Sequence, residues 1–226
     1  MKRGGSEAVK RRAGEHAASV VDDGMVVGLG TGSTAAHAIR SLGRRVDDGL
    51  DIVGIPTSYQ SRTLATESGI PLGALTETTP DIAIDGADQI AGDNCIKGGG
   101  GAHAREKLVD VTADRLLIVA DASKESRRLD MPVPVEVLPD ARQTVADAVE
   151  RIGGEPTLRA AKRKDGPVVT DNGNLLLDCA FGAIDDPSTL ATQLATLPGI
   201  VEHGLFVGEA DEFHIGDEHG VTVREG

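Results

Sequence analysis

The chain has 226 residues, of which 39% are hydrophobic and only 2% aromatic, and its formal net charge at pH 7 is −13. The electrostatic field of such a negative protein repels nucleic acids and anionic membranes, and few aromatic side chains are present to stack on bases. We therefore expect no nucleic-acid and no membrane partner. The length and the hydrophobic share indicate a globular protein of one or two domains with an aliphatic core.

The first half of the chain alternates between strand and helix patterns. Strands are expected over 25–29, 51–55, 81–84, 94–96 and 115–120, and helices over 7–21, 31–46, 57–68 and 102–112. This alternation is typical of an α/β fold with an open, mainly parallel sheet and crossover helices, as in Rossmann-like proteins. The apolar run LLIVA (116–120) fits a strand that is buried on both faces.

The composition changes at 131–139, where three prolines mark an extended segment. Beyond it we expect strands over 133–137, 157–160, 167–170, 175–180 and 200–205, helices over 141–152 and 187–196, and a hairpin turn at Asn172 and Gly173. This order indicates a small α+β, ferredoxin-like domain of the split βαβ type. The tail 206–226 predicts two short strands that return to the first domain. The expected domains are therefore 1–132 with 206–226, and 133–205.

The segment GLGTGSTAAH (28–37) follows the first expected strand and opens the next helix. A dinucleotide-binding fingerprint needs glycine at position 33, where this chain has Ser33. Backbone N–H groups, the positive end of the helix and the hydroxyls of Thr31, Ser33 and Thr34 instead form a cradle for a phosphate group. The alternative is an ordinary helix N-cap, since Ser and Thr are favoured there.

The segment DGADQI (85–90) carries two carboxylates, Asp85 and Asp88, at the end of the expected strand over 81–84. Residues three apart across a glycine-containing turn can converge on one small volume. The alternative is an ordinary turn, because Asp and Gly are common turn residues.

The segment KGGGGAHAREK (97–107) contains four successive glycines. Because glycine loses much conformational entropy on folding, such a run indicates that the backbone there approaches a ligand closely. Lys97 supplies a cation before the run, and Glu106 falls in the first or second turn of the following helix. The alternative is a flexible linker before a helix whose glutamate favours the N-terminal dipole. Lys124 also follows an apolar strand, and its alternative is a solvated loop lysine.

The histidines and cysteines indicate no metal or redox chemistry. His103, His214 and His219 lack the spacing of a metal site, so surface or capping roles are expected for them. No Gly-x-Ser-x-Gly motif is present, so serine hydrolysis lacks support. Cys95 and Cys179 form no CxxC pair, as expected for a reduced cytosolic chain.

The chain shows no sign of export. Residues 1–16 carry charges throughout, without the apolar core of a signal peptide, and no apolar run approaches the roughly 18 residues of a membrane span. A cytoplasmic location is expected. Abundant Asp and Glu with scarce Lys favours adaptation to a salt-rich cytoplasm, where ions screen self-repulsion, and an ordinary acidic cytosolic enzyme is the alternative.

These motifs together resemble those of the type A ribose-5-phosphate isomerases. The matching segments are GTGSTAAH (30–37), DGAD (85–88), KGGGG followed by REK (97–107), ADASK (120–124), PVEV (134–137) and TDNGN (170–174). The resemblance covers most of the chain and keeps the order and intervals of the segments. It implies an enzyme of the non-oxidative pentose phosphate pathway that interconverts the sugar phosphates D-ribose 5-phosphate and D-ribulose 5-phosphate. It further implies no metal or organic cofactor and a homodimer or homotetramer.

The resemblance also implies roles for residues of this chain. Glu106 matches the catalytic proton acceptor, and Asp85, Asp88 and Lys97 match further catalytic groups. The implied substrate-binding residues are Thr31, Gly32, Ser33, Thr34, Asp85, Gly86, Ala87, Asp88, Lys97, Gly98, Gly99, Gly100, Lys124 and Lys10. Two departures from the family pattern, Gly101 in place of alanine and His103 in place of an apolar residue, fall outside the matched catalytic positions.

The residue types fit a reaction through an enediolate, in which one base moves a proton between C2 and C1. Glu106 is the candidate base, and Lys97 with the glycine amides would stabilise the negative charge on the sugar oxygens. Two other functions remain open from the residues alone. A sugar-phosphate-binding sensor would need no carboxylate base, and another sugar-phosphate enzyme, such as a lactonase or an acyl-transfer enzyme, would use the same scaffold for other chemistry.

Overall fold

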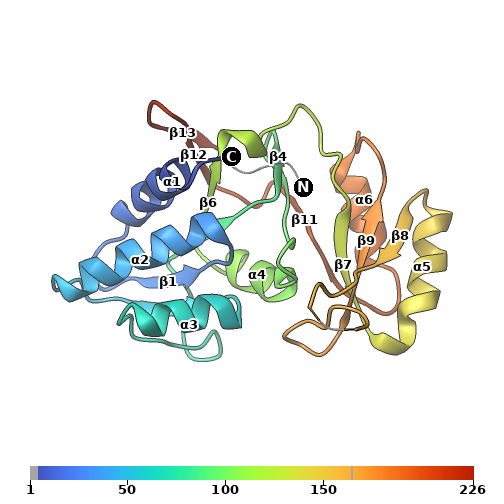
Figure 1. Ribbon diagram of the computed structural model, residues 1–226, viewed down its shortest axis with the longest axis horizontal. Helices are drawn as coiled ribbons and strands as arrows, with labels where there is room; N and C mark the ends of the chain where they lie inside the picture. Colours follow the sequence, from blue (N-terminus) through green and yellow to red (C-terminus); the bar gives the residue numbers. More distant parts are fainter. Residues whose placement is uncertain (1–4, 164) are drawn as a thin grey trace. The chain divides into compact units, whose positions relative to one another are not determined.

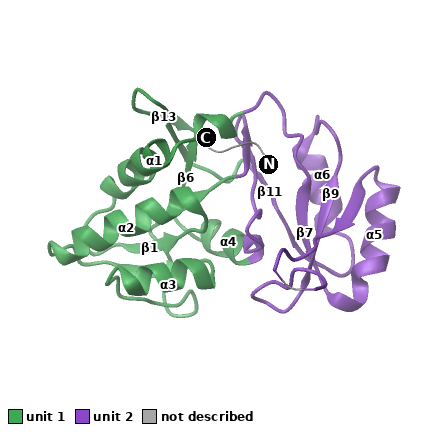
Figure 2. Cartoon of the chain, in the orientation of Figure 1, with its two compact units in different colours: residues 1–87, 105–125, 208–226 green, residues 88–104, 126–207 purple. Residues whose placement is uncertain are grey.

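The computed structural model describes residues 5–163 and 165–226, which divide into two compact units (Figure 2). The first unit contains residues up to 87, 105–125 and 208–226, and the second contains 88–104 and 126–207. The second unit thus includes residues 88–104, 126–132 and 206–207, which the sequence analysis assigned to the first domain.

The first unit is built around a six-stranded sheet with the order β13-β12-β6-β3-β1-β2. All neighbours in this sheet are parallel except β12 and β13. The strands are β1 (Val26–Leu29), β2 (Val53–Pro56), β3 (Ile82–Gly86), β6 (Leu116–Asp121), β12 (Glu212–Gly216) and β13 (Val221–Glu225). The helices of this unit are α1 (Glu7–Ser19), α2 (Ser33–Asp47), α3 (Tyr59–Glu67) and α4 (His103–Asp110), whose first two residues belong to the second unit, with a short 3-10 turn η1 (Ala122–Lys124). The predicted open, mainly parallel α/β sheet is confirmed.

Helices α1 and α2 pack side by side on one face of this sheet (Figure 1). The core between these helices and the sheet is aliphatic. Every second residue of the strands contributes to it, because successive side chains of a strand point to opposite faces. Its strand members are Val27, Leu29, Ile82, Ile84, Leu117 and Val119. On the opposite face, a Cβ at Gly28 would lie 2.9 Å from the Val109 side chain, so α4 covers β1 there.

The crossing of α1 over α2 depends on Gly14. A Cβ at this position would lie 2.7 Å from the carbonyl oxygen of Thr34 and 2.8 Å from the amide nitrogen of Ala38. Glycine therefore lets α1 approach the first turn of α2 backbone to backbone, which keeps α1 close to the loop that follows β1.

The second unit contains a four-stranded antiparallel sheet with the order β10-β7-β9-β8. Its elements are β7 (Val133–Val137), η2 (Pro139–Ala141), α5 (Arg142–Arg151), β8 (Glu155–Leu158), β9 (Leu175–Ala180), α6 (Pro187–Ala195) and β10 (Ile200–His203). If these four strands are numbered 1 to 4 in chain order, their order in the sheet is 4-1-3-2. Helix α5 connects β7 to β8, and helix α6 connects β9 to β10. The predicted ferredoxin-like arrangement is confirmed.

A three-stranded antiparallel sheet completes the second unit. It consists of β4 (Gln89–Ala91), β5 (Asn94–Ile96) and β11 (Leu205–Val207), in the order β11-β5-β4. The sequence analysis missed β4 and joined β10 to β11 in one strand over 200–205. The chain divides at Gly204, whose N–H donates to the Pro134 carbonyl and whose own carbonyl accepts from the N–H of Lys97. Gly204 therefore moves the chain from one sheet to the other.

Two further elements differ from the prediction. The helix expected from residue 31 begins at Ser33, because Gly32 has φ of +111°, outside the helical region. The strand expected over 167–170 is reduced to single antiparallel bridges, such as Val169 with Leu175. The turn at Asn172 and Gly173 between Val169 and Leu175 is present, with Gly173 at φ +84°.

The histidine His214 of β12 is almost fully buried, which corrects the expected surface role. Its Nε2 lies 3.0 Å from Glu212 Oε2, and its Nδ1 lies 2.9 Å from Nδ1 of His16 on α1. A proton on Nε2, donated to the carboxylate, leaves Nδ1 to accept from His16. This pattern needs a neutral His214, and burial lowers the pKa of His214 below its ordinary value of 6.5, although the hydrogen bond to Glu212 opposes the shift.

We expect His214 to make the folded protein less stable in mild acid. Because the pKa is lower in the folded than in the unfolded state, the contribution of His214 is complete above pH 6.5 and is lost as the pH falls below that value. Hydrogen bonds from His214 and Arg115 lower the pKa of Glu212 against the effect of burial, so its contribution is lost only below about pH 4.5.

The measurement is the urea midpoint at pH 7.5 and 5.5. The decrease in the urea midpoint from pH 7.5 to pH 5.5 should be larger for the wild type than for His214→Gln. Exposed His219→Gln should show the same decrease as the wild type. An equal drop in all three proteins would contradict the assignment.

Among the described residues, no helix combines the length and the apolar character that crossing a membrane requires.

Candidate active site

The carboxyl ends of β1 and β3 meet where the first sheet reverses its strand order. From β1 the chain passes through α2 to β2 on one side, whereas β3 pairs with the other side of β1. Open α/β sheets bind their ligands at such a switch point. The segments GLGTGSTAAH and DGADQI follow these two strands, so the fold brings two of the predicted motifs together.

Asp85 holds the two loops at the switch point together. Its side chain is fully buried, and its Oδ1 accepts hydrogen bonds from the N–H groups of Thr31 (2.8 Å) and Gly86 (2.6 Å). A Cβ at Gly30 would lie 2.3 Å from the same oxygen. Glycine at position 30 is therefore a condition for the Asp85 carboxylate to reach the loop after β1.

Hydroxyl groups gather around Thr31. Its Oγ1 donates to Ser58 Oγ (2.7 Å) and lies 2.8 Å from Thr57 Oγ1, which also bonds the carbonyl of Leu29. The sequence analysis gave Thr57 and Ser58 no role in a site. Their signal was available, because both follow the end of β2 at the same edge of the parallel sheet.

The predicted phosphate cradle lies at the start of α2. Its first backbone N–H groups have no partner within the helix, and the helix dipole makes this end positive. Ser33 is exposed and Thr34 is buried. Lys10 is on α1, one turn before Gly14 on the same face, and Gly14 contacts Thr34.

Lys10 is paired within its own helix. Its Nζ lies 2.9 Å from Glu7 Oε1, while the other oxygen of Glu7 lies 3.2 Å from Nε2 of His37 on α2. Hydrogen bonds from Lys10 and His37 lower the pKa of the Glu7 carboxyl. The Lys10 ammonium is thus held beside the first turns of both helices.

Lys124 lies at the same edge of the sheet. It ends η1, which begins directly after β6, and β6 pairs with β3. The buried carboxylate of Asp121 caps η1 by accepting from the N–H of Ser123 at 3.0 Å. The turn therefore fixes the backbone of Lys124 beside the end of β3, where Asp85 lies.

Glu106 lies in the first turn of α4, and only 4% of its surface is exposed. Helix α4 ends at Asp110 and β6 begins at Leu116, so the helix runs from the carboxyl edge of the sheet towards the amino edge. Glu106 precedes Val109 by three residues, about 4.5 Å along the helix. Val109 packs against Gly28. A strand advances about 3.3 Å per residue, so the distance of about 4.5 Å from Val109 back to Glu106 places Glu106 level with Leu29 and Gly30. That is the level at which Asp85 reaches the loop after β1.

The second unit brings together the remaining predicted residues. Asp88 and Lys97 flank the hairpin of β4 and β5, in which Gln89 pairs with Ile96. The Asp88 N–H donates to the Ile96 carbonyl (2.8 Å), and Asp88 Oδ2 accepts from the N–H of Gly99 (2.6 Å). The boundary between the two units falls between Ala87 and Asp88.

The glycine loop, residues 98–101, turns back on itself through a bond from the Gly101 N–H to the Gly98 carbonyl (2.9 Å). Gly98 has φ of +100° and Gly101 has φ of +79°, a region that strongly favours glycine. A Cβ at Gly99 would lie 2.6 Å from Asp88 Oδ1. These constraints favour glycine at positions 98, 99 and 101, and the family pattern has alanine at the last of them.

Lys97 is buried, with 1% of its surface exposed, and its Nζ lies 5.1 Å from the centre of the Phe206 ring. An ammonium at this distance from an aromatic face is attracted by the ring. His103 is also fully buried, which corrects the expected surface or capping role. Its Nε2 lies 3.2 Å from the Glu202 carbonyl, and its ring would meet a Cβ at Gly98.

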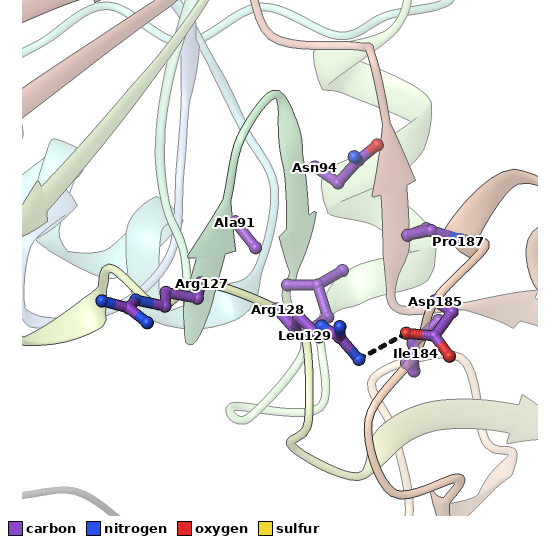
Figure 3. A pocket seen from close by; sticks show the side chains of 8 residues that line it. All are labelled: Ala91, Asn94, Arg127, Arg128, Leu129, Ile184, Asp185 and Pro187. Carbon is purple, nitrogen blue, oxygen red and sulfur yellow. Dashed lines mark hydrogen bonds and ion pairs between the residues drawn. The ribbon is translucent and has the colours of Figure 1, made fainter.

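One pocket in the second unit contains none of the predicted site residues (Figure 3). Its volume is about 290 Å³, and an ion pair of 2.7 Å joins Arg128 to Asp185 in its wall. It is lined by Ala91, Asn94, Arg127, Arg128, Leu129, Ile184, Asp185 and Pro187.

Comparison with known proteins agrees with these motifs. A family described as "Ribose 5-phosphate isomerase A (phosphoriboisomerase A)" matches residues 53–220. Ribose-5-phosphate isomerase A of Haloarcula marismortui is 66% identical over 224 residues, which cover 99% of this chain and 98% of the relative.

Solved structures agree as well. Ribose 5-phosphate isomerase A from Methanocaldococcus jannaschii superposes with a TM-score of 0.95 at 43% identity, over 98% of this chain and 100% of that chain. A D-ribose-5-phosphate isomerase in complex with phospho-erythronic acid gives a TM-score of 0.95 at 40% identity, with the same coverage. By sequence and by fold, the chain belongs to the ribose 5-phosphate isomerase A family, and it is an aldose–ketose isomerase.

Proposed function

We propose that Glu106 is the base in this enzyme's interconversion of D-ribose 5-phosphate and D-ribulose 5-phosphate. The observation that carries the proposal is a nearly buried carboxylate at the level where Asp85 meets the loop after β1. Glu106 takes the proton from C2 of the open-chain aldose and returns it to C1 of the enediolate, while the proton of the C2 hydroxyl passes to the C1 oxygen, so that the C2 carbonyl and the C1 hydroxyl of the ketose form. A single positioned carboxylate suffices because the two carbons are neighbours.

The negative charge that develops on the C1 and C2 oxygens needs donors aimed at it. Lys97 and the Gly100 N–H of the glycine loop fill this role, since the N–H groups of Gly99 and Gly101 already donate to Asp88 and to the Gly98 carbonyl. A donor of this type often contributes about 3 kcal/mol. Asp85 and Asp88 hold sugar hydroxyls and assist ring opening. Both are already fixed by backbone donors, Asp85 by Thr31 and Gly86 and Asp88 by Gly99, so they are oriented before substrate arrives.

The phosphate group is the handle that orients the reacting carbons. The N-terminus of α2 with Thr31, Gly32, Ser33 and Thr34 binds it, and Lys10 and Lys124 supply positive charge in an otherwise acidic protein. A relative was solved with phospho-erythronic acid, which combines a phosphate with a sugar-like chain, and this supports the same ligand chemistry here.

The test is to incubate the protein with ribose 5-phosphate and a chelator and to follow the ketose. Ketose should form at the same rate with and without chelator, because the mechanism uses no metal ion or organic cofactor. Binding without turnover would favour a sensor, and a different product would favour another sugar-phosphate enzyme.

We also propose that the enzyme is a cytoplasmic homo-oligomer, a dimer or a tetramer. Leu108 and Val111, in and just after α4, are 57% and 47% exposed and offer an apolar contact. Replacing Leu108 by glutamate should lower the mass measured by light scattering, whereas exposed Glu67→Gln should leave it unchanged. A wild-type protein that is monomeric at all concentrations would contradict the proposal.

The charge of −13 leads to an expectation about salt. If the acidic surface is adapted to a salt-rich cytoplasm, the thermal unfolding midpoint should rise between 0.1 M and 2 M KCl, because ions screen the repulsion between carboxylates. An unchanged midpoint would favour an ordinary acidic enzyme.

A further inference from the structure

We infer that Arg159 is a positioning residue that sets the direction of the N–H groups in the glycine loop. The inference rests on the proposed role of the Gly100 N–H at the enediolate oxygens. The sequence analysis gave Arg159 no role, because nothing in the local pattern LRAAKRK shows which backbone its side chain reaches.

Arg159 bonds two successive carbonyl groups of the loop. Its Nη1 donates to the carbonyl oxygens of Gly98 (3.0 Å) and Gly99 (3.2 Å). Its Nε and Nη2 form a two-point contact with the carboxylate of Asp178 on β9, with Nε 2.9 Å from Oδ2. The Arg159 backbone is held as well, since its N–H donates to the Leu176 carbonyl at 2.9 Å. The guanidinium is therefore fixed to the four-stranded sheet before it reaches the loop.

The direction of the carbonyls determines the direction of the amides. In a trans peptide the C=O and the N–H point to opposite sides, and no cis peptide is present among the described residues. Because the Gly98 and Gly99 carbonyls face Arg159, the N–H groups of Gly99 and Gly100 face away from it. The first of these N–H groups donates to Asp88 Oδ2 at 2.6 Å. The Gly100 N–H therefore points towards the side of the loop on which Asp88 lies.

Glycine itself cannot impose this arrangement. Without side chains, the loop has many accessible backbone conformations and no packing to select one. Arg159 selects the conformation from outside, and the positive guanidinium also polarises both peptide groups, which strengthens their N–H groups as donors. Asp178 neutralises the guanidinium, so Arg159 acts by orienting dipoles and does not present a free charge to a ligand.

The test compares Arg159→Met and Arg159→Lys with Arg142→Met, an exposed arginine of the same unit. With ribose 5-phosphate, Arg159→Met should lower kcat by about 100-fold, the effect of losing one oriented donor, and change KM less than threefold. Arg159→Lys keeps one donor but not the two-point contact with Asp178, and should recover part of the rate. Arg142→Met should match the wild type.

A second measurement separates positioning from general damage to the fold. The inhibition constant of phospho-erythronic acid should rise about 100-fold in Arg159→Met, while that of inorganic phosphate should stay within threefold. Equal losses for both ligands, or a kcat within threefold of the wild type, would overturn the inference.

If Arg159→Met does not fold, Asp178→Asn decides instead. This variant keeps the guanidinium of Arg159 but removes the carboxylate charge that orients it. Its kcat should fall about 10-fold and its inhibition constant for phospho-erythronic acid should rise about 10-fold, while the inhibition constant of inorganic phosphate stays within threefold. Failure of these tests leaves the proposed function intact so long as the wild type makes ketose, whereas a wild type that makes none overturns the function itself.

Discussion

Replacing Glu106 by glutamine should lower kcat for ribose 5-phosphate by about 10³-fold, within the range expected for loss of a general base. Glutamine has nearly the same shape and keeps a hydrogen-bonding side chain, but its amide cannot take a proton from C2. The side chain is almost entirely buried, so water cannot easily substitute for the missing base. The change is therefore expected in kcat, with KM little affected.

Solvent deuterium provides a sharper measurement than turnover. Wild-type enzyme should introduce deuterium from D₂O into the sugar as the proton is exchanged on the carboxylate, and Glu106→Gln should introduce none. Glu67→Gln, an exposed glutamate at the end of α3, is the matched control and should behave like the wild type. Turnover above a tenth of the wild-type rate in Glu106→Gln would exclude Glu106 as the base.

The strand–helix alternation predicted the parallel sheet because its buried strands contain apolar runs, such as Leu116–Ala120 of β6, a strand whose six residues are all buried. The loops after β1 and β3 were predicted for a related reason. Glycine and small polar residues directly after an apolar strand have few purposes other than a turn or a ligand site. The Asp85 contacts to Thr31 and Gly86 agree with that reasoning.

The contacts between distant segments were not predictable in this way. Arg159 lies 60 residues after Gly99, and a single arginine in a polar stretch carries no signal of its target. Strand β4 was missed because its first two residues were included in the turn motif DGADQI (85–90). Gly204 divides a stretch rich in β-branched and aromatic residues, and only the pairing of β10 with β7 and of β11 with β5 shows that two sheets share it.

Replacing Lys97 by methionine should lower kcat by 10²- to 10³-fold, about the effect of removing a principal oxyanion donor. Methionine retains most of the length and the apolar stem, so the packing of the stem is largely preserved. The Phe206 ring attracts the Lys97 ammonium, and burying an ammonium opposes folding. The unfolding midpoint of Lys97→Met is therefore measured beside its kcat.

The comparison of kcat with the unfolding midpoint is what identifies a functional lysine. A lysine kept for stability would lose both activity and midpoint on replacement, whereas one kept for the reaction loses activity alone. Exposed Lys162→Met, in the same unit, should change neither. A kcat above a third of the wild-type value would assign Lys97 to the fold and leave the enediolate oxygens to the Gly100 N–H of the glycine loop.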